Sequence, residues 1–176
     1  MYDEFYLYVC NTDSMNLYGS NKPSNFLVNL PKRYHLEGVW VCGLKEIYCE
    51  LSNNTPDIIN INYTGCEPSF VRGAYSPLLR MIPLLQRRPL VVEEKPKRIN
   101  TKKKDKKSVT GTNPTEKILT VTKPPEKQFM RQTFTSPIYI RMITHELDTI
   151  NISITDANGL PADLVYAMVT IHFKRL

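Results

Sequence analysis

The sequence predicts an all-β fold, a sandwich of about eight antiparallel strands interrupted by one long basic loop. Apolar residues recur at every second position in several short runs, and turn-forming residues separate these runs. No stretch has the 3.6-residue period of an amphipathic helix. Hydrophobic residues make up 41% of the 176 residues, which is enough for a packed core.

The first two expected strands alternate clearly. In residues 4–10 (EFYLYVC), Phe5, Leu7 and Val9 are in one phase and two tyrosines are in the other. Residues 25–31 (NFLVNLP) alternate in the same way, and we expect the proline to end this run. Each segment therefore predicts a strand with one buried face.

Residues 36–50 contain the only tryptophan and predict a long strand that crosses the core. The Val-Trp-Val run and the glycine in the middle count against a helix. The alternation shifts near Gly43, so we expect a bulge or bend at that glycine. We take the following residues as the core motif of this strand: Trp40, Gly43, Leu44 and Ile47.

The remaining expected strands follow the same period-two pattern. They are residues 57–63, 118–122, 137–143, 149–155 and 165–176. The last two flank Asn158-Gly159, a strong turn signal.

Residues 64–117 break the pattern and predict an insertion within one domain, between a first half at 1–63 and a second half at 118–176. The insertion is first proline-rich and then rich in lysine. Residues 92–117 hold nine Lys or Arg against four Asp or Glu, whereas the whole chain has a formal net charge of +6. A structureless connection of this length is usually functional or disordered.

The order of these segments resembles one protein family. The residues that carry the resemblance are Leu36, Gly38, Trp40, Gly43, Leu44, Glu46 and Ile47, the ITDANG turn at 154–159 and the HFKR ending at 172–175. Over residues 4–63 and 137–176 the chain is similar to the minor capsid protein, or penton, of Polinton/Maverick elements and adintoviruses.

The resemblance implies a single jelly roll that forms a homopentamer at the vertices of an icosahedral capsid. Its partner would be a double jelly-roll major capsid protein, and contact with packaged double-stranded DNA is one interpretation of the basic tract considered below. The protein would then be located in the virion, with the host nucleus as a place of assembly. Under this interpretation Trp40 fills space between two sheets.

The sequence offers no pattern for catalysis, and we expect neither an enzyme nor a cofactor. It has no G-x-S-x-G element and no glycine-rich phosphate loop. A metal or catalytic role for His35, His145 or His172 would require two of them to converge with an acid or a thiol. For Glu46 and Asp156 we favour structural roles over a base and a cation ligand, respectively.

The cysteines lack the spacing of a metal site. Cys10, Cys42, Cys49 and Cys66 are far apart, which predicts free and mostly buried thiols. No apolar run approaches the ~20 residues of a membrane-spanning helix.

Two questions stay open from the sequence. A β-sandwich that binds a ligand, such as a lectin-like module, is the alternative to a capsid protein. The basic tract has three interpretations: a nuclear-import signal, a contact with packaged DNA, or a solvated loop. The residues of this tract are Lys95, Lys97, Arg98, Lys102, Lys103, Lys104, Lys106 and Lys107.

The basic loop should contribute little to stability. Replacing residues 92–117 with a short Gly/Ser linker should change the free energy of unfolding only slightly, because each halving of loop length alters the closure entropy by about 0.6 kcal/mol. Urea unfolding of both proteins measures this. Residues 95–107 fused to a large fluorescent carrier test import separately, and a carrier that stays in the cytoplasm rejects that role.

Overall fold

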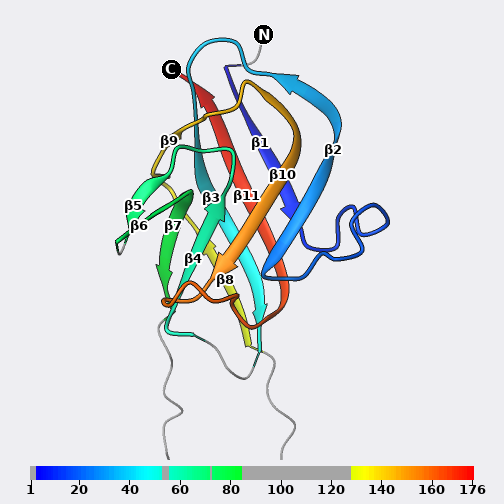
Figure 1. Ribbon diagram of the computed structural model, residues 1–176, viewed down its shortest axis with the longest axis vertical. Helices are drawn as coiled ribbons and strands as arrows, with labels where there is room; N and C mark the ends of the chain where they lie inside the picture. The colour runs from blue at the N-terminus through cyan, green and yellow to red at the C-terminus, as the bar shows by residue number, and fades with distance from the viewer. Residues whose placement is uncertain (1–2, 53–55, 72, 85–127) are drawn as a thin grey trace, which may run out of the picture. The chain divides into compact units, whose positions relative to one another are not determined.

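The computed structural model describes residues 3–52, 56–71, 73–84 and 128–176, and these residues form strands and loops without any helix (Figure 1). The strands are β1 (Glu4–Cys10), β2 (Asn25–His35), β3 (Trp40–Leu51), β4 (Ile58–Tyr63), β5 (Ser69–Val71), β6 (Ala74–Ser76), β7 (Leu78–Pro83), β8 (Gln128–Thr133), β9 (Ile140–Arg141), β10 (Glu146–Thr155) and β11 (Leu164–Arg175). In this part of the chain, no helix is long and apolar enough to cross a membrane.

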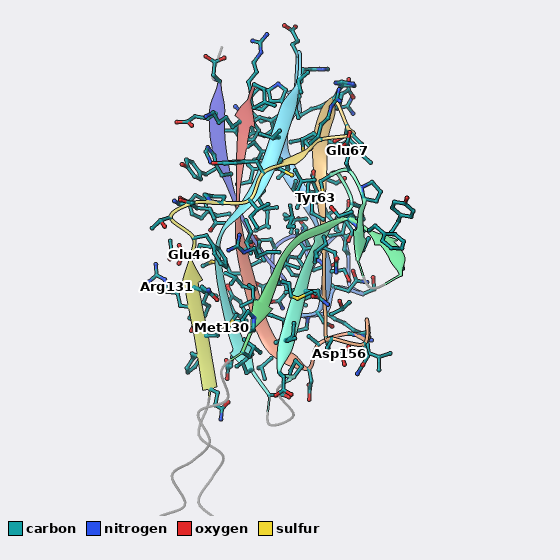
Figure 2. All side chains as sticks on the ribbon, turned by 90° about the vertical axis from the view of Figure 1, so that its left-hand side faces the viewer. Glu46, Tyr63, Glu67, Met130, Arg131 and Asp156 are labelled. Carbon is teal, nitrogen blue, oxygen red and sulfur yellow. The ribbon has the colours of Figure 1, made fainter. Side chains whose placement is uncertain are left out.

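Two antiparallel sheets face one another (Figure 1). Sheet A has the order β1-β11-β3-β8, with β9 also paired to β3, and sheet B has the order β2-β10-β4-β7. At the β8 edge of sheet A, Arg131 forms an ion pair with Glu46 of β3 (Figure 2). The short strands β5 and β6 form a separate hairpin. The prediction of an all-β, antiparallel sandwich is confirmed.

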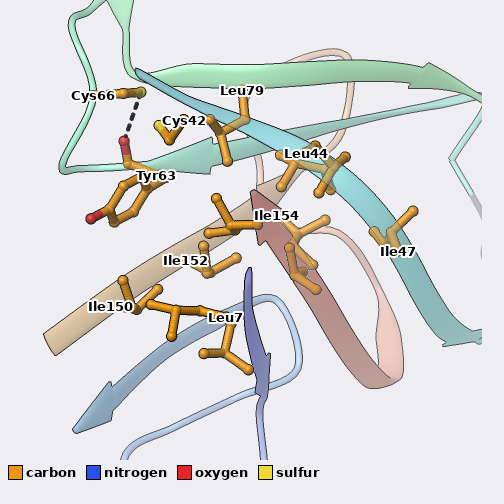
Figure 3. Close-up of a cluster of buried hydrophobic side chains, with 14 of the residues drawn as sticks. Leu7, Cys42, Leu44, Ile47, Tyr63, Cys66, Leu79, Ile150, Ile152 and Ile154 are labelled. Atoms are coloured by element: carbon orange, nitrogen blue, oxygen red, sulfur yellow. Dashed lines mark hydrogen bonds between the residues drawn. The ribbon is translucent and has the colours of Figure 1, made fainter. Parts of the chain in front are cut away.

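The core lies between the sheets and is built from alternate residues of their strands (Figure 3). Phe26, Val28 and Leu30 of β2 are buried, as the alternation predicted. Ile150, Ile152 and Ile154 of β10 and Ile59, Ile61 and Tyr63 of β4 complete the inner face of sheet B. Opposite them lie residues from sheet A, including Leu7, Val9, Leu44, Ile47, Val169, Ile171 and Phe173.

The bulge in β3 is at Lys45 and not at Gly43, so the predicted position was wrong. The pairing with β11 passes from Ile171↔Leu44 directly to Thr170↔Glu46, which leaves Lys45 as the extra residue. An extra residue reverses the phase of a strand. Hence Leu44 faces the core before the bulge and Ile47 faces it after the bulge, and both are buried.

Trp40 lies in an aromatic cluster that joins the two sheets. Its ring is 5.6 Å from that of Phe5, which stacks on Phe173 of sheet A and on Tyr34 of sheet B. The indole N–H donates a hydrogen bond to the carbonyl oxygen of Glu37 at 3.1 Å. With 5% exposure, Trp40 is part of the core, as expected.

Pro31 does not end its strand, because β2 continues to His35. The pairing of β2 with β10 is irregular between Asn29 and Tyr34, and β2 is an edge strand of its sheet. A proline at such a position removes no hydrogen bond from the ladder.

The N-terminal part of the predicted insertion, residues 64–117, forms strands. Strands β5, β6 and β7 lie within residues 64–117, and β7 pairs with β4 as the last strand of sheet B. Proline residues at 77 and 83 obscured its alternation, but an edge strand tolerates them. The basic tract, from Lys95 to Lys107, and the expected strand at 118–122 lie outside the described residues.

Two strands differ from the prediction. Of the expected strand at 137–143, only Ile140–Arg141 form a strand, β9. Strand β8 was not predicted, because its side chains are mostly exposed. The predicted Asn158-Gly159 turn is present: Gly159 has a φ of 81°, and one carboxylate oxygen of Asp156 accepts hydrogen bonds from the N–H groups of Asn158 and Leu160. Asp156 therefore has the structural role expected of it.

The aromatic cluster gives a direct test of the core. We expect Trp40→Ala to lower the free energy of unfolding by roughly 3–5 kcal/mol, the usual effect of truncating a large buried aromatic side chain. Val39→Ala is the matched control, because Val39 is 41% exposed and should matter little. Denaturant titrations of the three proteins measure both effects. If the emission maximum of Trp40 in the native protein equals that of free tryptophan in water, this would contradict the burial of the side chain.

Candidate functional site

One row of residues on the outer face of sheet A joins three strands. Tyr6 of β1 is paired with His172 of β11, and His172 is paired with Gly43 of β3. Residues that are opposite one another in neighbouring strands project to the same face. This face is turned away from the core, yet His172 is only 5% exposed. Other residues of the chain must therefore cover His172 on this outer face.

The cover is the chain segment that connects β8 to β9. β8 pairs with one half of β3 and β9 with the other half, so the connection runs beside β3. A Cβ atom on Gly43 would lie 2.7 Å from the carbonyl oxygen of Ile138 and 3.0 Å from Cβ of Pro137. We call residues 137–139 the strap. Gly43 is required because only glycine lets the strap approach this closely.

His172 binds the strap through Tyr139. The Tyr139 hydroxyl is 2.8 Å from Nδ1 of His172, and the ring of Tyr6 stacks on the imidazole at 4.3 Å. Burial, followed by the neighbouring Tyr6 and Glu4, raises the pKa of Tyr139. The phenol therefore keeps its proton and can donate it in a hydrogen bond to Nδ1.

In the tautomer that accepts this bond, the imidazole proton is on Nε2, which faces Glu4. The Glu4 carboxylate lies 3.3 Å from Nε2, although the two groups are not aligned as a hydrogen bond. A carboxylate, an imidazole and a hydroxyl in a row can also serve catalysis, but a phenol with a raised pKa is a poor nucleophile. In this arrangement His172 holds the strap on the sheet.

Exposed aromatic and aliphatic side chains surround this row. Tyr8 is 69% exposed on β1, and Ile138 and Tyr139 are exposed on the strap. Further along the same sheet, Tyr48 packs against the rings of Phe129 and Tyr166. Aromatic side chains gathered on one face of a sheet are typical of a protein interface.

The β5–β6 hairpin carries a second exposed aromatic pair. Phe70 and Tyr75 are 66% and 77% exposed, and their rings contact each other at a centroid distance of 5.3 Å. Gly73, with a φ of 85°, forms the turn between the two strands. Little of these rings is covered by the rest of the described chain.

Two hollows lie near the strap, with volumes of about 730 Å³ and about 320 Å³. Glu67 and Arg141 line both and form an ion pair at 3.8 Å. Among the described residues, no group of three or more His, Cys, Asp or Glu could hold a metal ion. His35 instead pairs with Glu146 at 3.3 Å, and His145 lines the smaller hollow.

The sequence analysis identified Gly43 but not its contact with the strap. Leu44 and Ile47 are core residues, whereas Gly43 belongs to the outer face and makes room for the strap. Tyr139 and the strap were missed, because their position depends on how β8 and β9 divide the length of β3. A glycine inside an apolar strand was the one available signal of a close backbone approach.

A scan against protein-family models finds no match to this chain, and a search of curated proteins finds none either.

The fit of the strap over Gly43 can be tested with one methyl group. Gly43→Ala should lower the free energy of unfolding by about 1–3 kcal/mol, because the added Cβ meets backbone atoms of the strap. Gly19→Ala is the matched control, since nothing lies within 4 Å of the added Cβ there. Urea unfolding of both variants makes the comparison. Equal stabilities of the two variants would show that the strap does not depend on Gly43.

Proposed function

We propose that this protein is a structural minor capsid protein, a single jelly roll whose homopentamers occupy the vertices of an icosahedral capsid. Its neighbours in the capsid would be double jelly-roll major capsid proteins. The order of the strands in the two sheets carries this proposal, and the family resemblance and the exposed aromatic surfaces support it.

The strand order is that expected of a jelly roll. The two four-strand paths contain β1, β2, β3, β4, β7, β8, β10 and β11. When these are counted in chain order, sheet A reads 1-8-3-6 and sheet B reads 2-7-4-5. The chain thus passes from one sheet to the other at nearly every step, which is how two Greek keys wrap into a jelly roll. This fold is common in capsid proteins and in lectins.

The exposed aromatic groups favour the capsid interpretation. Tyr8 lies on β1, the first strand in the order of sheet A. Phe70 and Tyr75 lie on the hairpin that precedes β7, which is the last strand in the order of sheet B. A cyclic ring needs two different surfaces on each subunit, because its contacts run head to tail. Two separate apolar surfaces meet this requirement.

The basic tract would supply a further function in this setting. Lysine and arginine side chains bind phosphates without base specificity. Contact with packaged double-stranded DNA and recognition by an import receptor both fit this charge, and the fusion experiment above tests recognition by an import receptor.

A lectin-like function is the second candidate, favoured by the outer face of sheet B. Asn60, Asn62, Asn151 and Ser153 provide uncharged hydrogen-bonding groups across β4 and β10. However, Asn60 and Asn62 already donate to the backbone carbonyls of Asp156 and Ser153. If the protein binds a glycan array and Asn151→Ala abolishes this binding, the lectin-like function is favoured over the capsid function.

Electron microscopy tests the capsid proposal. We expect the purified full-length chain to form rings with five-fold symmetry in negative stain. Tyr8→Ser and Phe70→Ser should shift these rings toward monomers, because each removes an exposed aromatic side chain from one of the two surfaces. Leu160→Ser is the control, since Leu160 is exposed in the 156–161 turn. Trimers would contradict the proposal, and rings that neither aromatic substitution affects would place the contact elsewhere.

A further inference from the structure

Strand β1 has a free backbone edge. It is the first strand in the order of sheet A and pairs only with β11 among the described strands. The N–H of Arg175, at the end of β11, donates a hydrogen bond to the carbonyl oxygen of Asp3. Along an antiparallel ladder, residues whose backbone groups face the partner strand alternate with residues whose groups face away. The residues of β1 whose N–H and C=O groups face away from β11 are therefore Glu4, Tyr6 and Tyr8.

The described part of the chain leaves these outward groups of β1 unbonded. The loop after β1 covers only the end of the strand, where the Asp13 carboxylate accepts a hydrogen bond from the N–H of Cys10. No other described residue bonds to the outward N–H and C=O groups between Glu4 and Tyr8. The side chain of Tyr8 is also 69% exposed beside this edge. A strand of another molecule could therefore pair with β1.

The edges of sheet B are protected in a way that β1 is not. At β2, the Asn21 side chain accepts a hydrogen bond from the N–H of Leu27 and donates one to its carbonyl oxygen. The Ser14 hydroxyl accepts a hydrogen bond from the N–H of Asn29. At β7, on the other edge, Pro83 has no N–H to offer. Loops and prolines at an edge prevent the addition of another strand.

Strand β8 is the second free edge of sheet A. It is the last strand in the order and pairs only with β3 among the described strands. The N–H of Phe134, just after β8, donates a hydrogen bond to the carbonyl oxygen of Lys45. Figure 2 shows β8 along the margin of the molecule, with Arg131 labelled on it. By the same alternation, the residues of β8 whose backbone groups face outward are Phe129, Arg131 and Thr133.

The two free edges are complementary in direction. Neighbouring strands of sheet A are antiparallel throughout its order, so β1 and β8 run in opposite directions. Copies related by rotation about an axis along the strands keep their strand directions. Such a rotation brings β8 of one copy antiparallel to β1 of the next copy. The contact is head to tail, which is the kind that a ring requires.

The two edges are also complementary in charge. Residues 3–10 contain Asp3 and Glu4 and no Lys or Arg, whereas residues 128–133 contain Arg131 and no Asp or Glu. The Arg131 side chain is 70% exposed even though it pairs with Glu46. Pairing of β8 with a second β8, centred on its outward residues, would place Arg131 opposite its own copy, and like charges opposite one another are unfavourable. The charges therefore favour β1 as the partner of β8.

We propose that sheet A continues from one copy to the next through a backbone ladder between β8 and β1. In the register that uses all the outward groups, the opposed residues are Thr133 and Glu4, Arg131 and Tyr6, and Phe129 and Tyr8. The Arg131 side chain is then diagonal to Glu4 of the neighbouring copy, within reach of a long side chain. This contact rests on the proposed assembly of copies into a ring and assigns the edges that meet.

Proline substitutions test the ladder in the full-length chain. A proline at an outward position removes a donor that the strand does not use within its own copy. Tyr8→Pro and Arg131→Pro should each abolish the rings formed by the wild-type chain, and both variants should sediment as monomers. Met81→Pro is the matched control, because the N–H of Met81 also faces outward, from β7 of sheet B. Association of Met81→Pro should equal that of the wild type.

A mixture of the two variants tests the head-to-tail direction. Tyr8→Pro keeps β8 intact, and Arg131→Pro keeps β1 intact. An equimolar mixture, sedimented at the highest soluble concentration, should therefore contain dimers with one copy of each variant and no rings. Dimers of Arg131→Pro alone would show that β1 pairs with β1, and they would overturn the proposal. A mixture that stays monomeric would overturn it as well.

Hydrogen exchange of the wild-type chain decides the question even if a proline variant does not fold. The amides of Tyr6, Tyr8 and Arg131 should exchange about tenfold or more slowly in the assembled protein than in the dilute monomer, whereas that of Met81 should not change. Five-fold rings without this protection would overturn the contact and leave the capsid proposal standing. Filaments or rings of another size with this protection would support the contact and contradict the capsid proposal. A wild-type chain that stays monomeric would overturn the contact.

Discussion

The pairing of β3 with β11 is the interaction on which the rest of the structure depends. These are the central strands of sheet A: β11 also carries β1, and β3 also carries β8 and β9. Their register includes the bulge at Lys45, and this single extra residue decides which side chains of β3 reach the core. Without the bulge, burial of Leu44 and burial of Ile47 would be incompatible, because the two residues are three positions apart.

The same pairing connects the core to the surface. It sets Gly43 opposite His172, so the space left by the missing side chain lies next to the imidazole. The strap occupies that space, and Tyr139 reaches the imidazole from it. The exposed Ile138 and Tyr139 are therefore held on a fixed segment, which suits a surface that has to fit a neighbouring subunit. The proposed capsid function would rely on such surfaces.

The two sheets also meet at particular residues and not only through general burial. Phe5 stacks on rings from both sheets, and Tyr63 of sheet B contacts the edge of Phe173 in sheet A.

Period-two alternation in residues 4–10, 25–31 and 57–63 was sufficient to predict an all-β fold and the buried face of these strands, because a strand with one solvent-exposed face must alternate. It could not locate β8, whose edge position leaves most of its side chains exposed, or the continuation of β2 beyond Pro31. The bulge at Lys45 and the strap over Gly43 both depend on residues that are distant in the chain. Local patterns carry no information on such contacts, since they arise only when the register between strands brings those residues together.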